Sequence, residues 1–301
     1  MTSQEFHMTT RISFQSMMVN LFLFALKGLL GMQIASASLL SDAVHSLTDI
    51  FSTLIVLIGI RVSSKPSDAG HPYGHEKIEC VIALLLGVML FGIGGGIGWD
   101  GVKKLFHPAA AVPQYSVMNG LAMGAAVVSI GAKEWMYRFT MKCAKRIRSS
   151  SMAADAWHHR SDALSSVGSL AGVFGMRLGY PVIDAAACLV ISVFIFKAAY
   201  GICADACAKL VDAACSPELT GRIKKIAKSN REVLAVDALK TRQYGSKIYV
   251  DLEITLDRNA SLAHSHDVAE EIHNEIEGDF SQVKHCMIHV NPSMLVNHHH
   301  I

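Results

Sequence analysis

The chain contains 301 residues, of which 51% are hydrophobic and 17% are charged, and its formal net charge is +2. Together with a mean hydropathy of +0.34, these fractions exceed what a soluble domain of this length usually shows. The small net charge gives no reason to expect a nucleic-acid partner. Composition therefore predicts an α-helical membrane protein in contact with lipid, followed by a more polar tail.

Six apolar stretches are each long enough to cross a hydrocarbon core of roughly 30 Å. They cover residues 12–34, 37–61, 79–106, 115–139, 151–177 and 182–206, and the fourth and fifth are the least apolar. We therefore predict a transmembrane transport domain of six helices over residues 1–206. The N-terminus lacks the pattern of a secretory signal peptide, so we expect the first helix to insert without cleavage.

Basic residues flank the apolar stretches unevenly. Arg11 precedes the first stretch, and the turns near 31–36 and 178–181 contain no basic residue. Lys103 and Lys104, at the third connection, are a minor indication of the opposite orientation. The residues that indicate the cytoplasmic side are Arg61, Lys65, Lys77, Lys133, Arg138, Lys142, Lys145, Arg146 and Arg148. By the positive-inside rule, this distribution predicts a multi-pass protein of the inner (plasma) membrane with both termini in the cytoplasm.

From residue 207 onward the pattern becomes that of a soluble α/β domain. Helical periodicity covers residues 217–229 and 264–277, and strand-like alternation covers residues 233–241, 247–256 and 283–290, with a turn at 244–246. The order αββαβ over residues 207–301 predicts a compact ferredoxin-like cytosolic domain.

Two histidine–aspartate pairs with the same spacing lie within the apolar stretches: His45 with Asp49, and His158 with Asp162. Ionisable residues inside a membrane are costly, which makes them candidates for a functional site. A spacing of i, i+4 places both members of a pair on one helical face. Two facing helices would thus present two imidazoles and two carboxylates, a donor set that suits tetrahedral Zn²⁺. The alternative is simple pairing within each helix.

Other polar residues accompany these pairs. Asp42 and Asp155 each precede a site histidine by three residues, so they either line an ion path or are solvated near the membrane surface. His159 should point about 100° away from His158 and should not share its ion.

Three motifs in order carry a family resemblance: S-D-A-V-H-S-L-T-D at 41–49, H-P-Y-G-H-E-K at 71–77 and H-H-R-S-D at 158–162. With six spans and an αββαβ tail, the chain resembles bacterial members of the cation diffusion facilitator family. The resemblance implies a homodimeric exporter, not an enzyme, that moves Zn²⁺ or a similar ion out of the cytoplasm against inward proton flow. No catalytic cofactor is expected, and the divalent cation is the transported and possible regulatory ligand.

The resemblance also implies a second metal site in the loop between the second and third spans, formed by Asp68, His71 and His75. Three ligands suit a weakly held ion with water in the fourth position. The alternative is a polar loop whose histidines meet only water or phosphate headgroups.

The tail departs from the zinc-exporting relatives that the chain resembles. Asp237 and Asp251 stand where those relatives have histidine, and Asn291 replaces a bridging aspartate, so the paired His-rich site is not expected. A single weak ion remains an expectation, with the ligands Asp251, His266 and either His289 or His285. The alternative is ordinary surface histidines.

Other functions stay open on the sequence alone. The same donors would suit Fe²⁺, Mn²⁺, Cd²⁺ or Co²⁺, although His45, an aspartate in some relatives, favours zinc. A membrane-embedded oxidase also uses clustered histidines, but it needs many of them at the surface rather than carboxylates within spans. A membrane metal sensor or scaffold would bind the same ions without transport.

Overall fold

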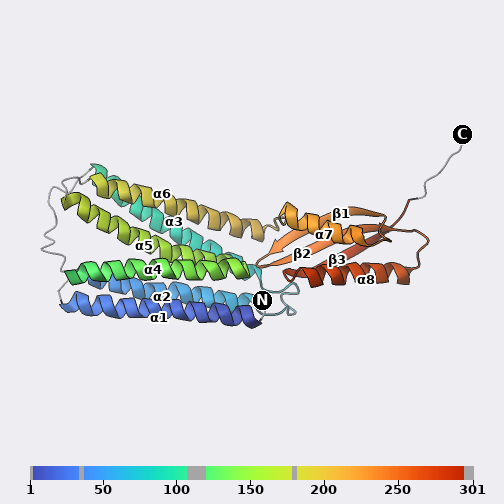
Figure 1. Cartoon of the computed structure of the whole chain (residues 1–301), viewed down its shortest axis with the longest axis horizontal. Helices are drawn as coiled ribbons and strands as arrows, with labels where there is room; N and C mark the ends of the chain where they lie inside the picture. Colours follow the sequence, from blue (N-terminus) through green and yellow to red (C-terminus); the bar gives the residue numbers. More distant parts are fainter. Residues whose placement is uncertain (1–2, 34–36, 107–119, 178–181, 295–301) are drawn as a thin grey trace. The chain divides into compact units, whose positions relative to one another are not determined.

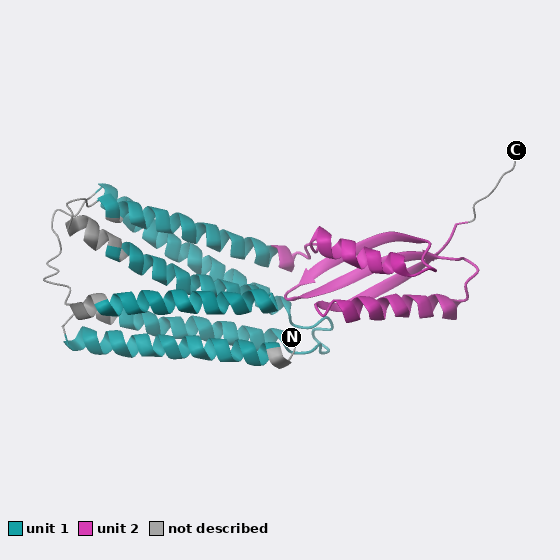
Figure 2. Ribbon diagram, in the orientation of Figure 1, with its two compact units in different colours: residues 1–207 teal, residues 208–301 magenta. Residues whose placement is uncertain are grey.

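The computed structural model describes residues 3–33, 37–106, 120–177 and 182–294 (Figure 1). The chain divides into two compact units, residues 1–207 and 208–301, which are described separately below (Figure 2). The beginning of the predicted fourth span, at residue 115, lies outside the described residues.

Long helices make up the first unit, as the sequence predicts. Their bounds are α1 Ser3–Gln33, α2 Ala37–Ser63, α3 Lys77–Phe106, α4 Gly120–Ile147, α5 Ser150–Arg177 and α6 Val182–Leu210. Large apolar side chains such as Phe22, Val193 and Phe194 are exposed on them, as expected of surfaces that face lipid. The prediction of a helical membrane unit is confirmed.

Hydropathy separates these helices into two groups. Within the described residues, α1, α2, α3 and α6 are long and apolar enough to cross a membrane. Helices α4 and α5 have 28 residues each but carry buried polar residues, in the middle of α4 and in the first half of α5, which lowers their hydropathy. Those buried residues include Lys133 in α4 and Asp155, His158, His159 and Asp162 in α5. The interior of the bundle is therefore polar where these two helices contribute to it.

Helix α3 approaches α6 closely through glycine. A Cβ atom added at Gly94 would lie 3.1 Å from Ile195 Cγ2, and one added at Gly98 would lie 2.6 Å from Ser192 Oγ. Ser192 Oγ donates a hydrogen bond of 2.9 Å to the Gly94 carbonyl across the two helices. Small residues and interhelical hydrogen bonds are the usual means of packing helices in lipid, because apolar burial gains little there.

The second unit has the predicted order αββαβ: α7 Pro217–Ser229, β1 Ala235–Tyr244, β2 Lys247–Leu256, α8 Leu262–Asp279 and β3 Val283–Pro292. The sheet order is β1-β2-β3, with β1 antiparallel and β3 parallel to β2. Gly245, at φ 63°, makes the tight turn of the β1–β2 hairpin, where glycine avoids the strain of a left-handed conformation. Ser216 and Ser261 cap the starts of α7 and α8 with their hydroxyl oxygens.

The core of this unit lies between one face of the sheet and the two helices. Val250, Leu252 and Ile254 of β2 are buried against Ile223 of α7 and Ile272 of α8. Alternate residues of β2 and β3 point the other way, and several of these are exposed. The sheet therefore has one covered face and one open face.

Candidate metal centres

The two histidine–aspartate pairs predicted within the membrane helices meet in the first unit, and they pair across helices. His158 Nε2 of α5 lies 3.1 Å from Asp49 Oδ1 of α2, and His45 Nε2 of α2 lies 3.4 Å from Asp162 Oδ1 of α5. Within α2, His45 Nε2 is 4.0 Å from Asp49 Oδ1. The shorter contacts join the two helices, so pairing within each helix does not describe this group.

Burial differs among the four side chains. Asp49, His158 and Asp162 are buried, whereas the His45 side chain is 52% exposed. Ligand atoms of His45, Asp49 and Asp162 lie within 4.8 Å of one another. A tetrahedral Zn²⁺ with bonds of about 2.0–2.1 Å places neighbouring ligand atoms about 3.3 Å apart. The two nitrogen–oxygen distances between α2 and α5, 3.1 Å and 3.4 Å, are close to that spacing.

Lys133 of α4 lies against both carboxylates of this group. Its Nζ donates to Asp49 Oδ2 and, at 2.9 Å, to Asp162 Oδ2, and the lysine is only 3% exposed. Our sequence interpretation counted Lys133 among the basic residues flanking the fourth span, and that interpretation is wrong. Two buried carboxylates need a nearby positive charge, and the position of Lys133 inside a predicted span was the feature that could have revealed this role.

Three polar residues near this group, Asp155, His159 and Asp42, differ in their burial. Asp155 is buried and accepts a hydrogen bond of 3.2 Å from Thr53 Oγ1, so of the two alternatives left open by the sequence, solvation near the membrane surface does not hold for it. His159 is fully buried, with Nε2 3.7 Å from Asp155 Oδ2. Asp42 is exposed and forms an ion pair of 3.1 Å with the buried Lys27 of α1. Of the two aspartates, only Asp155 belongs to the buried polar interior.

The loop after α2 brings Asp68, His71 and His75 together. His71 Nδ1 lies 3.4 Å from Asp68 Oδ1, and His75 Nε2 lies 3.3 Å from Asp68 Oδ2. The backbone N–H groups of His71 and Gly70 donate to Asp68, which lowers the pKa of its carboxyl group. Asp68 and His71 are exposed and His75 is buried, so an ion could reach this cluster from solvent.

The four ligands predicted in the tail do not form one group within the chain. Asp251 lies opposite Met287, and His289 lies opposite Glu253, on the open face of the sheet. His266 is exposed on α8, which packs on the covered face. Among the described residues, His285 is the member of this set that joins a group of possible metal ligands, together with His273 and Glu277. Strand register and the opposite placement of α8 explain the separation.

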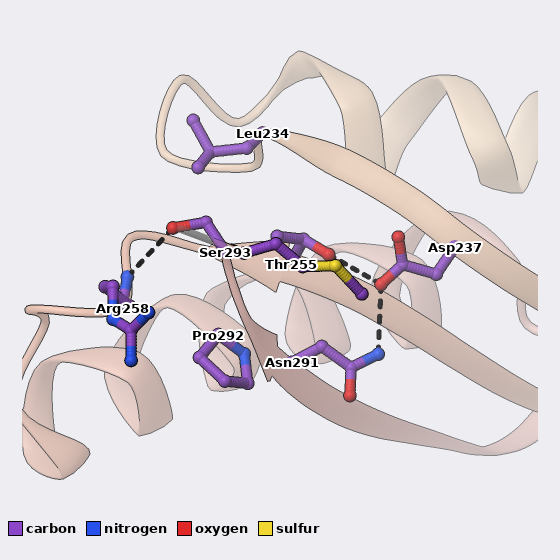
Figure 3. A pocket seen from close by; sticks show the side chains of 8 residues that line it. Leu234, Asp237, Thr255, Arg258, Asn291, Pro292 and Ser293 are labelled. Atoms are coloured by element: carbon purple, nitrogen blue, oxygen red, sulfur yellow. Dashed lines mark hydrogen bonds between the residues drawn. The ribbon is translucent and has the colours of Figure 1, made fainter. Parts of the chain in front are cut away.

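Asp237 and Asn291, which the family resemblance suggested to stand at ligand positions of the paired site, are bonded to each other. Asn291 Nδ2 donates to Asp237 Oδ2 at 3.0 Å, and Thr255 Oγ1 donates to the same oxygen at 2.6 Å (Figure 3). Both hydrogen bonds lower the pKa of Asp237. These three residues line a pocket with Leu234, Arg258, Pro292, Ser293 and Met294. One carboxylate oxygen is thus already occupied by two protein donors.

Two family models match the chain in the order of its two units. The model of the cation efflux transmembrane domain matches residues 13–211, and the model of the cation efflux protein cytoplasmic domain matches residues 215–293. The first match extends from within α1 to the end of α6, and so includes the less apolar α4 and α5.

Several curated proteins are similar along most of the chain. An uncharacterized transporter of Methanocaldococcus jannaschii is 33% identical over 92% of this chain and 95% of its own length. The manganese efflux system protein MneP of Bacillus subtilis is 30% identical over 97% of this chain and 99% of its own length. Magnetosome protein MamB of Magnetospira is 28% identical over 88% of this chain and 89% of its own length. The chain therefore belongs to the cation diffusion facilitator family of metal efflux transporters, which are not enzymes.

Proposed function

We propose that this chain exports Zn²⁺ from the cytoplasm by proton antiport, as a homodimer in the plasma membrane with both termini in the cytoplasm. The observation that carries the proposal is the group of two imidazoles and two carboxylates paired between α2 and α5. His45, Asp49, His158 and Asp162 are the proposed ligands of the transported ion. Two nitrogen and two oxygen donors suit zinc in a tetrahedral site.

The transported ion must reach this group of ligands from one side of the membrane at a time. His45 is the half-exposed member, so the ion first meets its imidazole and then passes to the buried carboxylates. Alternating access follows if a rocking movement of the helices opens the same group to the opposite side of the membrane. The cation then leaves by the second opening.

Protons provide the coupling through competition for the same atoms. Zinc binds deprotonated imidazole and carboxylate, so its affinity falls as acidity rises. On the acidic side of the membrane, protons displace the cation from the ligands, and they leave again on the cytoplasmic side. Because four ionisable groups lie in contact, they take up protons as a coupled set rather than one by one.

Lys133 adds a second competitor inside the protein. Its ammonium group bridges Asp49 and Asp162, the same carboxylates that are proposed to hold the metal. A bound cation and this ammonium group repel each other at such short range. Lys133 therefore swings away when the metal enters and returns when the metal leaves, which prevents two buried carboxylates from facing each other without a positive charge.

Asp68, His71 and His75 form a second, weaker site in this proposal. Two backbone N–H groups donate to the carboxylate of Asp68 and lower its pKa, which favours the ionised form that binds a metal. Its exposure to solvent favours rapid exchange of the ion. This loop site is expected to assist transport without being required for it.

A manganese exporter is the second candidate, because MneP is named for manganese efflux and is similar over nearly the whole chain. Carboxylate oxygen suits Mn²⁺, whereas imidazole favours Zn²⁺, so the donor set supports zinc more strongly. His45→Asp should therefore shift preference from zinc towards manganese. An unchanged order of preference would mean that the shape of the site, rather than its ligands, sets selectivity.

Flux into proteoliposomes tests the function. With an acidic lumen, Zn²⁺ should enter through molecules whose cytoplasmic side faces outward, and a proton ionophore should slow that entry. Parallel assays with Mn²⁺, Fe²⁺, Cd²⁺ and Co²⁺ establish the order of preference. If calorimetry detects zinc binding but no metal crosses under the proton gradient, the chain is a sensor or scaffold and the transport proposal fails.

A further inference from the structure

A third group of metal-ligand side chains lies in the second unit, where α8 meets β3. His273 and Glu277 are one turn apart on α8, and His285 is near the start of β3. His273 Nε2 lies 3.3 Å from Glu277 Oε1, and His285 Nδ1 lies 3.4 Å from the same oxygen. The rings of the two histidines are 5.7 Å apart. Two imidazoles therefore converge on one carboxylate.

The backbone of Cys286 holds both α8 side chains in place. The Cys286 carbonyl is 2.7 Å from His273 Nδ1, and the Cys286 N–H donates to Glu277 Oε1 at 2.9 Å. A carbonyl oxygen only accepts, so His273 Nδ1 carries the hydrogen and its Nε2 keeps a free lone pair. Histidine ligands of metals are commonly held in this way, with one ring nitrogen donating to a backbone carbonyl and the other facing the ion.

The spacing of the three ligands matches a zinc ion. Both nitrogen–oxygen distances are close to the roughly 3.3 Å between neighbouring ligands of tetrahedral Zn²⁺. The side chains of His273, Glu277 and His285 are 23%, 31% and 49% exposed, so an ion has a path from solvent. Cys286 itself is buried in the core of the unit, which leaves its thiol out of the ligand set.

We propose that His273, Glu277 and His285 bind one Zn²⁺ or similar borderline cation per chain, with water as the fourth ligand. This site is separate from Asp251, His266 and His289, the other ligands predicted in the tail. Its ligands are also distinct from those of the proposed transport site, because none of its residues belongs to the first unit. An ion bound here joins α8 to β3 and stabilises the folded unit by mass action.

Zinc calorimetry on the full-length protein in detergent tests the site. All variants carry Asp49→Ala and Asp68→Ala, so the two sites of the first unit are weakened equally and transport is not needed for the readout. In this background, His285→Asn and Glu277→Gln should each lose one zinc equivalent per chain. The amide oxygen introduced by Glu277→Gln can still accept from the Cys286 N–H, so the strand contact is kept.

Two exposed histidines of α8 provide matched controls. His264→Ala and His266→Ala should keep the zinc equivalent, because neither side chain belongs to the group. Equal thermal unfolding of the variants in chelator checks that they are folded. Binding of Co²⁺ gives a second readout, since the absorption bands of a tetrahedral nitrogen–oxygen site should disappear in His285→Asn and persist in both control variants.

The proposal is overturned if His285→Asn and Glu277→Gln bind as much zinc as their parent. It is also overturned if the equivalent is lost in His266→Ala instead, since that result assigns the ion to the ligand set predicted from the sequence. Failure of zinc flux in proteoliposomes would leave this binding result unchanged, so the two proposals are tested separately.

Discussion

Lys133 is a buried lysine inside the helical unit, at 3% exposed, and it lies between two buried carboxylates. An ammonium group that is almost completely buried pays a large desolvation cost, and here it contacts two carboxylates that would otherwise repel each other. Its ammonium group supplies a positive charge to both Asp49 and Asp162. In the function proposed above, this is the charge that the transported cation replaces.

Lys133→Met should therefore make the folded protein depend on metal. In chelator, the free energy of unfolding should fall by about 3–5 kcal/mol, because two buried carboxylates lose their counter-charge. Added zinc should restore more stability to this variant than to the parent. Thermal unfolding in detergent, with chelator and with zinc, measures both effects.

Lys142→Met is the matched control, since Lys142 is exposed on the same helix. Its stability should stay within about 0.5 kcal/mol of the parent. If Lys133→Met unfolds like the parent in chelator, the two carboxylates do not depend on the lysine.

Cys286 predicts a pH dependence for the second unit. Burial, together with the carboxylates of Glu277 and Asp251, raises the pKa of this thiol to about 12. In an unfolded chain the pKa of a cysteine thiol is about 8.5, so the folded unit holds the proton more tightly. Stability from this source is complete below about pH 8.5 and is lost as the pH rises towards 12. Urea unfolding of residues 208–301 between pH 8 and 11 should show the decline.

Cys286→Ala removes the titrating group and should flatten that decline, although the smaller side chain lowers stability at neutral pH. An equally steep decline in the variant would assign the pH dependence to other groups.

At the scale of elements, the packing of α3 on α6 depends on the absence of side chains at particular positions. Gly98→Leu should destabilise the first unit by about 1–3 kcal/mol, because the new side chain would overlap Ser192. The hydrogen bond from Ser192 to the Gly94 carbonyl should be lost with it. Thermal unfolding in detergent measures the change.

Gly96→Leu is the control on the same helix, since a Cβ atom at Gly96 meets nothing within 4 Å. This variant should be neutral or slightly stabilising, because leucine has the higher helix propensity. Equal destabilisation by both substitutions would show that glycine matters here for reasons other than the contact with α6.

The sequence predicts these elements well where a regular pattern decides them. Alternation in β2 predicts residues 247–256, the bounds that the structure has, because one face of that strand is buried and the other is open. The predicted strand 233–241 is observed as β1, Ala235–Tyr244, which begins two residues later, and the predicted strand 283–290 is observed as β3, Val283–Pro292. Both strands end later than predicted because pairing with β2 continues beyond the apolar pattern. Spacing of i, i+4 also predicts that His45 and Asp49 share one face of α2 and that His158 and Asp162 share one face of α5. The structure pairs these four residues across the two helices.

The sequence pattern does not predict which side chains of different helices and strands come into contact. The approach of Lys133 to the carboxylates depends on how α4 packs against α1 and α5, and no local spacing encodes that. Likewise, the sequence predicted Asp251, His266 and His289 as one ligand set. They are separated because the two strand residues lie on the open face of the sheet and α8 packs on the covered face. His285 instead meets His273 and Glu277, a grouping that requires the α8–β3 contact.

At the scale of the whole molecule, two units with different cores carry proposed metal sites of different character. In the first unit, three of the four side chains are buried, the pairs join two helices, and a lysine contacts both carboxylates, as expected of a site that must release its ion. In the second unit, the group is partly exposed to solvent, and the backbone of Cys286 forms hydrogen bonds to His273 and Glu277. A buried site suits transport, whereas an exposed one suits sensing of the metal concentration around it.

Zinc flux through proteoliposomes containing single-residue variants is the most direct test of the central site. Asp162→Asn keeps the shape of the side chain but removes a charge, so zinc transport should fall to the background of empty vesicles while the protein remains folded. Asp68→Asn should retain most of the flux, because the loop site is separate from the path between α2 and α5. Asp100→Asn, an exposed position of α3, should behave as the parent. Near-normal flux through Asp162→Asn would contradict the assignment of the transport site.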